Sequence, residues 1–457
     1  ACAEAQESRV DTALSKEMVP VKGNVAAEGL QDSAAQVPKE LTIGVAQLAT
    51  EATLEQNLGK ILRFIREARA QGCRVLVVPE DGLDSLPDTT RAQIDAGVEA
   101  VQRAAAQSGI YVVLCLAYRL SDGEPKHNRM IVIAPDGEVI HVYDKLWYDE
   151  RFPNVPGLFQ IDGIPCCGTI CADRWVRSVE ELPAFAGAQV LFECSNNYAN
   201  EWLPDLGWYW YVPRALRNGA YVVFCNASQS RPGIETAGLG PGHGHSAVIA
   251  PDGSLVAAAG EEADRLLVAT LDLSQATRAE ALRRHNHPLF QAFWDMGTRI
   301  MAGDKVDAPP FAPRQSSEIP IALAAAQMAC SRSVADNLAR MRQMLQEAKA
   351  RGAQVVAFPE LVVTGARDED ILAATPEALQ SALRDVQAMA EALKLYVAFG
   401  MPHMHADGHR TNAAFVAGPD GALLTRYDQL VVDRPDLFVP GTSSKAMWFD
   451  CLGVPAI

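Results

Sequence analysis

The sequence lacks the features that place a protein in a membrane or on nucleic acid. It contains no apolar run of about 18 residues or more, so no predicted helix spans a bilayer. It carries 40 Lys and Arg against 56 Asp and Glu, a net charge of -16, and no cluster of basic residues. Such an acidic chain repels a phosphate backbone, so we do not expect nucleic acid as a partner.

Paired cysteines are also missing. Ten cysteines are scattered along the chain, several inside apolar runs as at Cys115, Cys194 and Cys225, and no CxxC pair occurs. This pattern is typical of buried, reduced thiols and does not favour a zinc or redox site. The His-Gly-His at 243–245 has the residue types of a metal site but no nearby carboxylate or cysteine partner, so we expect no metal.

The first residues show no apolar periodicity. They are rich in Ala, Glu, Gln and Ser, which predicts a disordered leader or linker over 1–40. The opening ACAEAQ has the small residues that flank the cleavage site of an export signal or lipid anchor. A sequence that simply begins at an arbitrary point would show the same small residues. We therefore expect a cytoplasmic protein by default, with an exported or lipid-anchored bacterial protein as the alternative.

What the chain does contain is a long internal repeat. Residues 143–157 read YDKLWYDERFPNVPG, and residues 427–441 read YDQLVVDRPDLFVPG. Lys145 of the first phrase is replaced by neutral Gln429 in the second. Matching residues keep the same spacing within two blocks: Gln47 to Glu80 matches Gln327 to Glu360, and Asn128 to Lys145 matches Asn412 to Gln429. These matches indicate a duplicated domain rather than a short solenoid repeat.

The repeat predicts how the chain is divided. We expect a first domain over 41–305, a linker rich in Pro and Ser over 306–317 and a partial second domain over 318–457. Aligning the copies places the second nucleophile position beyond Ile457, so the second copy is predicted to be truncated and inactive. A partial copy that caps the first domain is the alternative, although half a sandwich would leave apolar strands uncovered.

Hydrophobic periodicity predicts an α/β fold. Residues 41–48 form a strand pattern, 54–65 a helix pattern, and 129–143 two strands joined by a Pro-Asp-Gly turn. Further helices are predicted over 178–187 and 207–218. Strands that alternate with helices, together with hairpins, favour a mixed sheet covered by helices.

Three reactive side chains stand at the ends of predicted strands: Glu80, Lys145 and Cys171. Strand ends in α/β folds are where catalytic groups collect. A thiol nucleophile, a carboxylate that accepts its proton and an ammonium that balances charge on oxygen form a coherent set for acyl transfer. Taken singly, a cysteine of this kind is more often a core residue, and a glutamate or lysine is more often a solvated charge. The case for catalysis therefore rests on the sequence motifs around the three residues.

Those blocks resemble the nitrilase superfamily, the carbon–nitrogen hydrolases. VVPEDGL, YDKLWYDERF and GTICADRW occur in the family's order, and the resemblance covers about 41–285. It implies a four-layer α-β-β-α sandwich, duplicated here, and no cofactor. It also implies a triad in which Glu80 is the general base, Lys145 stabilises the oxyanion and Cys171 is the nucleophile. Glu150 matches a second glutamate that many members use.

The resemblance also suggests groups that contact the substrate. The N–H of Ala172 is the expected second donor to the oxyanion. Asn196 and Asn197 stand where family members line the acyl pocket, and Trp175 lies in the nucleophile block. The aromatic stretch 201–215 either walls a pocket or packs at a subunit interface. Because members often associate through one face of the sandwich, we expect an intrachain pseudo-dimer or a homo-oligomer.

The implied function is hydrolysis of a non-peptide C–N bond. An amide, N-carbamoyl compound or nitrile of small size would react through a cysteine thioester and release ammonia or an amine. Acyl transfer to an amine, or ammonia supply to a partner enzyme, is a second interpretation. A pseudoenzyme that acts as a scaffold or binding module is a third.

Overall fold

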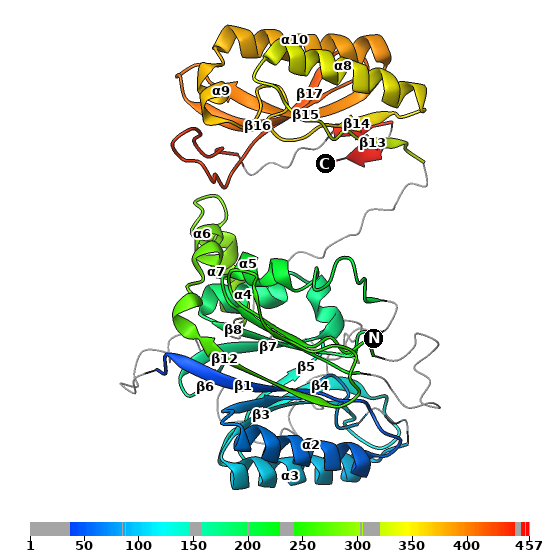
Figure 1. Ribbon diagram of the computed structural model, residues 1–457, viewed down its shortest axis with the longest axis vertical. Helices are drawn as coiled ribbons and strands as arrows, with labels where there is room; N and C mark the ends of the chain where they lie inside the picture. The colour runs from blue at the N-terminus through cyan, green and yellow to red at the C-terminus, as the bar shows by residue number, and fades with distance from the viewer. Residues whose placement is uncertain are drawn as a thin grey trace, which may run out of the picture. The chain divides into compact units, whose positions relative to one another are not determined.

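The chain forms two compact units in a computed structural model (Figure 1). The first comprises 1–286 and 291–307, and the second comprises 287–290 and 308–457. The structure describes residues 37–84, 86, 88–146, 157–198, 201–228, 242–301, 304, 320–443, 449–452 and 454–456. The predicted linker, and the predicted leader up to residue 36, lie outside the described residues.

Two six-stranded sheets form the centre of the first unit. One has the order β12-β1-β2-β3-β4-β5 and the other β11-β10-β9-β8-β7-β6. The first sheet consists of β1 (Glu40–Gln47), β2 (Val75–Val77), β3 (Tyr111–Tyr118), β4 (His127–Ile133), β5 (Val139–Asp144) and β12 (Arg265–Asp272). The second consists of β6 (Phe159–Ile161), β7 (Ile164–Ile170), β8 (Val190–Ser195), β9 (Tyr221–Asn226), β10 (Ala247–Ile249) and β11 (Leu255–Ala258).

Helices cover the outer faces of both sheets. The helices α2 (Leu54–Ala70) and α3 (Arg91–Ser108) lie on the first sheet, and α4 (Ser178–Ala186) and α5 (Val212–Asn218) lie on the second. The helices α6 (Ala279–His285) and α7 (Gln291–Met301) pack against α4. Phe64 of α2 and Val101 of α3 pack on the first sheet, and Ala215 of α5 packs on the second. The resulting layers, helix, sheet, sheet and helix, confirm the predicted α-β-β-α sandwich (Figure 1).

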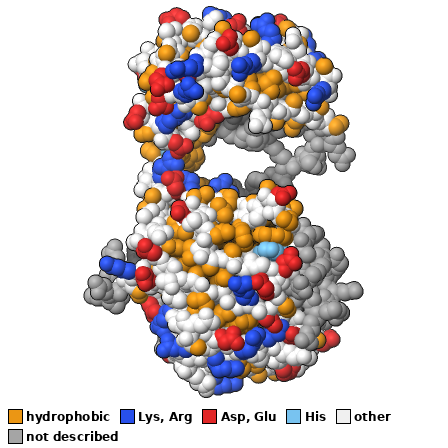
Figure 2. All heavy atoms as spheres, in the orientation of Figure 1, with side chains coloured by type: hydrophobic (Ala, Val, Ile, Leu, Met, Phe, Trp, Pro, Cys, Tyr) orange, Lys and Arg blue, Asp and Glu red, His pale blue; other side chains and the backbone are white. Residues whose placement is uncertain are grey.

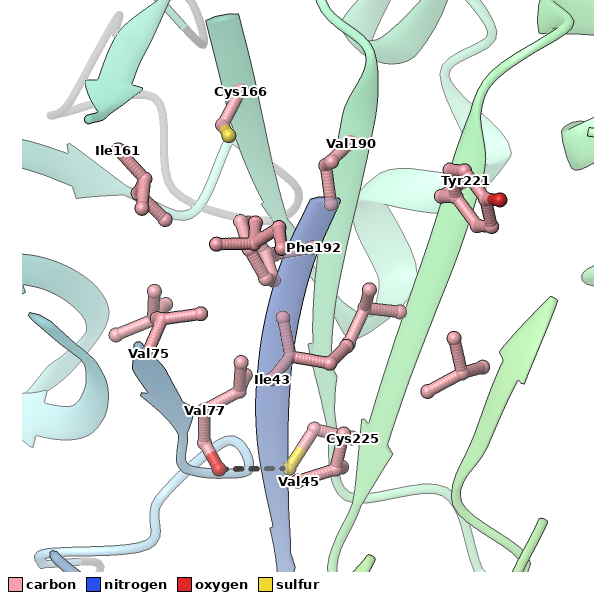
Figure 3. Close-up of a cluster of buried hydrophobic side chains, with 14 of the residues drawn as sticks. Ile43, Val45, Val75, Val77, Ile161, Cys166, Val190, Phe192, Tyr221 and Cys225 are labelled. Atoms are coloured by element: carbon pink, nitrogen blue, oxygen red, sulfur yellow. Dashed lines mark hydrogen bonds between the residues drawn. The ribbon is translucent and has the colours of Figure 1, made fainter. Parts of the chain in front are cut away.

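The main core lies between the two sheets. Val45 and Val77 of the first sheet and Phe192 of the second, all fully buried, belong to this core and are drawn in Figure 3. The thiol of Cys225 donates to the backbone carbonyl of Val77 at 3.5 Å, which ties β9 to the end of β2. This packing fixes the two sheets against each other at the point where the chain continues to Glu80.

Local sequence explains both ends of α3 and shows why the predicted start of α5 was wrong. Thr90 and Gln93 form a reciprocal capping box at the start of α3, and Gly109 ends that helix with φ 65°. The helix predicted over 207–218 begins only at Val212. Pro213 occupies its first turn, where the missing N–H has no helical acceptor, so the preceding residues form turns instead.

The second unit repeats half of this architecture. A five-stranded sheet has the order β13-β14-β15-β16-β17, matching β1 to β5, and β18 and β19 form a separate two-stranded sheet. Its elements are β13 (Leu323–Ala325), α8 (Val334–Ala350), β14 (Val355–Ala357), α9 (Asp368–Ala373), α10 (Pro376–Leu393), β15 (Tyr396–Met404), β16 (Arg410–Ala417), β17 (Leu423–Asp428), β18 (Phe449–Cys451) and β19 (Val454–Ala456). Both α8 and α10 contribute to its buried core.

The surface carries both charge signs. On the face drawn in Figure 2, basic and acidic side chains are interspersed with apolar ones. Across the described part of the chain, no helix is both long and apolar enough to cross a membrane.

Candidate active site

Glu80 and Lys145 follow two strands of the first sheet that are separated by β3 and β4, and their side chains meet. Glu80 follows β2, Lys145 follows β5, and Nζ of Lys145 donates to Oε1 of Glu80 at 2.6 Å. Both side chains are largely buried, with 5% of the Glu80 and 14% of the Lys145 side chain exposed. The close contact therefore forms in a site shielded from bulk water, where charge interactions are strong.

Further donors hold the Glu80 carboxylate. The amide of Asn128 donates to Oε1, and the backbone N–H of Asn196 donates to Oε2 at 3.1 Å. The carbonyl of Asn128 also accepts the Lys145 backbone N–H at 2.9 Å. Asn128 thus positions both charged groups, because its side chain binds one and its backbone binds the other.

Cys171 sits on a sharp turn directly after β7 of the second sheet. Its φ of 47° lies in the left-handed region, which costs a non-glycine residue roughly 1 kcal/mol. The carboxylate of Asp173 stabilises this turn, since Oδ2 accepts the Ile170 N–H at 3.2 Å and the Tyr143 hydroxyl at 2.8 Å. Asp173 therefore anchors the turn to β5, the strand that carries Lys145.

The Cys171 sulfur lies among polar groups. Sγ donates to Oδ1 of Asn197 at 3.4 Å, and Nη1 of Arg174 approaches Sγ at 3.6 Å. Burial, and next the negative charge of Glu80, raise the pKa of the Cys171 thiol to about 12, although Lys145 and Arg174 act in the opposite direction. The resting sulfur is therefore a protonated thiol at neutral pH, and attack requires a base to remove its proton.

Lys145 remains protonated at neutral pH. Burial disfavours its ammonium, but the charges of Glu80 and Cys171 and the hydrogen bond to Glu80 together raise its pKa above the usual range. A permanent cation beside a carboxylate and a thiol can neutralise negative charge that develops on a substrate oxygen.

The chain matches the carbon–nitrogen hydrolase family over residues 42–281 and 322–447. It belongs to that family. Both copies of the repeat fall within the match, and membership identifies the protein as a hydrolase of carbon–nitrogen bonds.

Similar proteins include several amidases. The 2-oxoglutaramate amidase of Bacillus subtilis is 27% identical over 51% of this chain and 90% of its own length. The omega-amidase of Danio rerio is 28% identical over 50% of this chain and 88% of its own. A solved amidase of Nesterenkonia, from the nitrilase superfamily, is 21% identical, covers 56% of this chain and 99% of its own, and has a TM-score of 0.48.

The four residues predicted to contact the substrate differ in how they relate to Glu80 and Cys171. Ala172 is the second residue of the short helical turn Cys171–Trp175. Asn196 reaches Glu80 through its backbone, and Asn197 contacts Cys171 through its side chain. Trp175 is 48% exposed, and its ring packs edge-on against another ring, that of Trp210.

Glu150 lies outside the described residues. The structure therefore gives no position for the second glutamate. The catalytic and binding roles suggested by the family resemblance remain predictions for all eight candidate residues, and the geometry above describes the seven that the structure includes.

The aromatic stretch packs around the His-Gly-His segment. Trp202 stacks on His245 with ring centroids 3.7 Å apart, and the indole N–H of Trp208 donates to the His245 carbonyl at 2.7 Å. Tyr211 reaches the site itself, because its hydroxyl accepts a hydrogen bond from the Asn197 amide. Among the described residues, no group of three His, Cys, Asp or Glu side chains is arranged to hold a metal ion.

Sequence reasoning missed two neighbours of the site. Asn128 lies 17 residues before Lys145, as Asn412 does before Gln429, and this repeated spacing was the available signal for its role. Tyr198 carried no signal. Burial raises the pKa of its phenol, and the charges of Glu80 and Cys171 raise it further, which places Tyr198 beside these groups.

A cleft opens at Asp81 and Asn128, and its described lining does not include Glu80, Lys145 or Cys171. Its volume is ≈ 550 Å³, and Asn128, which donates to Glu80, forms part of its lining. Charged residues of both signs also line it, namely Asp81, Arg119, Glu124 and Lys126. The cleft is large enough for a small molecule, and Asn128 connects its lining to Glu80.

The second copy keeps this geometry without its cation. Asn412 donates to Oε1 of Glu360, as Asn128 does to Glu80, and its carbonyl accepts the Gln429 N–H at 2.8 Å. The Asn412 amide also donates to Oε1 of Gln429, at 3.0 Å. A neutral amide therefore occupies the position that the ammonium of Lys145 has in the first copy.

Proposed function

We propose that the first unit hydrolyses small amides through a thioester on Cys171. The observation that carries this proposal is the contact between Lys145 Nζ and Glu80 Oε1, together with the effect of both groups on the Cys171 thiol. The amidases among its relatives support an amide as the substrate.

Acylation begins when Sγ of Cys171 attacks the amide carbonyl carbon. Glu80 accepts the thiol proton as the C–S bond forms and the carbonyl π bond opens to an oxyanion. Lys145 and the N–H of Ala172 stabilise that oxyanion, and each donor of this kind contributes about 3–4 kcal/mol. Collapse then breaks the C–N bond, and Glu80 returns the proton to the departing nitrogen as ammonia.

Deacylation repeats these steps with water. Glu80 removes a proton from water as its oxygen attacks the thioester carbon, and the C–S bond breaks when the second oxyanion collapses. The sulfur regains its proton from Glu80. The sum is one amide and one water converted to one carboxylic acid and one ammonia.

We assign this activity to the first unit alone. The second unit has Gln429 in place of the lysine, and a neutral amide cannot neutralise an oxyanion as an ammonium does. The second unit is therefore a non-catalytic copy.

Ammonia release from a panel of primary amides, N-carbamoyl compounds and nitriles tests the proposal. Cys171→Ala and Glu80→Gln should abolish release, whereas Cys330→Ala, which removes an exposed thiol of the second unit, should not affect it. Intact mass measurement should detect an acyl adduct only in chains that retain Cys171. Equal ammonia release by the wild type and Cys171→Ala would refute the assignment.

A further inference from the structure

Asp81 is a second carboxyl beside the proposed base. It follows Glu80 directly and lines the ≈ 550 Å³ cleft. Within the described part of the chain, its Oδ1 is buried and has no hydrogen-bond partner. A buried polar atom without a partner is unfavourable unless a ligand supplies one.

The fold does not require a carboxyl at this place. Asp81 has a φ of 58°, and Leu361, its counterpart after Glu360, has a φ of 53°. The two copies thus share one left-handed turn but carry different side chains. Leu361 is 1% exposed and packs in an apolar cluster, so the turn forms equally well around a hydrocarbon.

Neighbouring cations are already engaged with other carboxylates. Lys145 donates to Glu80, and Lys126 donates to Asp84 and to the Leu86 carbonyl. Asp81 therefore faces two cations whose charges are each matched by another acid.

The protonated form of Asp81 predominates at pH 7. Burial, with the charges of Glu80 and Asp84, raises its pKa to about 8, while Lys145 and Lys126 act to lower it. The remaining charged groups of the cleft lining are Arg119 and Glu124. A positively charged ligand nitrogen would favour the ionised form, and the carboxyl proton would then pass to solvent.

We propose that Asp81 binds a protonated nitrogen of the substrate, so that the preferred substrates are small amides carrying an ammonium group. The Asp81 carboxylate accepts a charge-assisted hydrogen bond from that ammonium while the amide carbonyl faces Cys171. This assignment rests on the proposed amidase function. It makes Asp81 a specificity-determining residue, and the base remains Glu80.

Binding to the Cys171→Ala protein tests the assignment without requiring turnover. Calorimetry would compare three ligands of similar length: 6-aminohexanamide, neutral heptanamide and the carboxylate adipamic acid. We expect 6-aminohexanamide to bind roughly tenfold or more tightly than heptanamide at pH 7. Its affinity should rise between pH 6 and about 8, because the bound form has lost the Asp81 proton.

Two variants test whether the preference for the ammonium ligand depends on Asp81. Asp81→Leu introduces the residue that the second copy carries and should reduce the ratio of the two affinities to about one. Glu124→Gln removes another carboxylate from the same cleft and should leave that ratio intact. Thermal unfolding of each variant verifies that it is folded.

Several results would overturn the assignment. They are equal binding of 6-aminohexanamide and heptanamide, tighter binding of adipamic acid than of 6-aminohexanamide, no detectable binding of 6-aminohexanamide, or a preference for 6-aminohexanamide that survives Asp81→Leu. Failure of the amidase function is distinguishable, because it appears as absent ammonia release from the protein that retains Cys171, whatever the binding preference.

Discussion

The Tyr143 hydroxyl donates a 2.8 Å hydrogen bond to Oδ2 of Asp173, joining the strand before Lys145 to the turn of Cys171. Tyr143 is fully buried and crosses from one sheet to the other. This bond links the proposed oxyanion donor and the proposed nucleophile by a short path of side chain and backbone. The distance between the two groups therefore depends on it.

Tyr143→Phe should lower kcat roughly three- to tenfold with a smaller change in KM, because the nucleophile turn loses one of its anchors. Tyr221→Phe is the matched control, since it removes a 2.9 Å hydrogen bond to the Asp272 carbonyl at the other end of the unit. Steady-state ammonia release measures both variants. Equal kinetic effects would show that the Tyr143 bond contributes only to general stability.

Exchanging Lys145 and Gln429 tests the difference between the two copies. Lys145→Gln reproduces the second copy and should reduce kcat by about 100- to 1,000-fold, the usual effect of removing one oxyanion donor. Gln429→Lys should leave the activity of the chain unchanged. If Lys145→Gln retains substantial activity, the ammonium does not stabilise the transition state.

The positions of the three proposed catalytic residues could be predicted because they follow from local patterns. Glu80, Lys145 and Cys171 each follow a strand within a recognisable block; in the structure Lys145 contacts Glu80, and the charges of both affect the Cys171 thiol. The partners of these groups could not be predicted, because they depend on the register between strands and between sheets. Asn128 meets Glu80 only through the pairing of β4 in the first sheet, and Asp173 meets Tyr143 only across the core.

Arg174 offers a test of the electrostatics around the nucleophile. Its Nη1 lies 3.6 Å from Sγ of Cys171, and its charge lowers the pKa of the thiol against the effect of burial. Arg174→Met should therefore raise that pKa and slow alkylation of Cys171 by iodoacetamide at pH 8, by about tenfold for each unit of change.

Arg174→Lys keeps the charge and should restore part of the alkylation rate. Cys330, exposed in the second unit, supplies an internal reference in the same samples. Peptide mass spectrometry would follow both sites over time. A Cys171 rate that is the same in all three proteins would exclude a role for the guanidinium.

His141 predicts a loss of stability in mild acid. Its side chain is 3% exposed, packs on Phe159 with ring centroids 5.1 Å apart, and burial lowers its pKa from 6.5 to about 4. The unfolded chain therefore takes up a proton between these values that the folded chain rejects, so stability falls as pH falls through that window. At pH 5 the expected loss is about 2 kcal/mol.

His141→Leu should remove this acid-dependent loss, so the variant should lose about 2 kcal/mol less than the wild type between pH 7 and pH 5. Urea unfolding followed by tryptophan fluorescence measures the difference, because most tryptophans belong to the first unit. His409→Leu, which alters a partly exposed histidine of the second unit, is the control and should behave as the wild type. An identical pH response in the wild type and His141→Leu would show that burial does not lower the pKa of His141 in the folded chain.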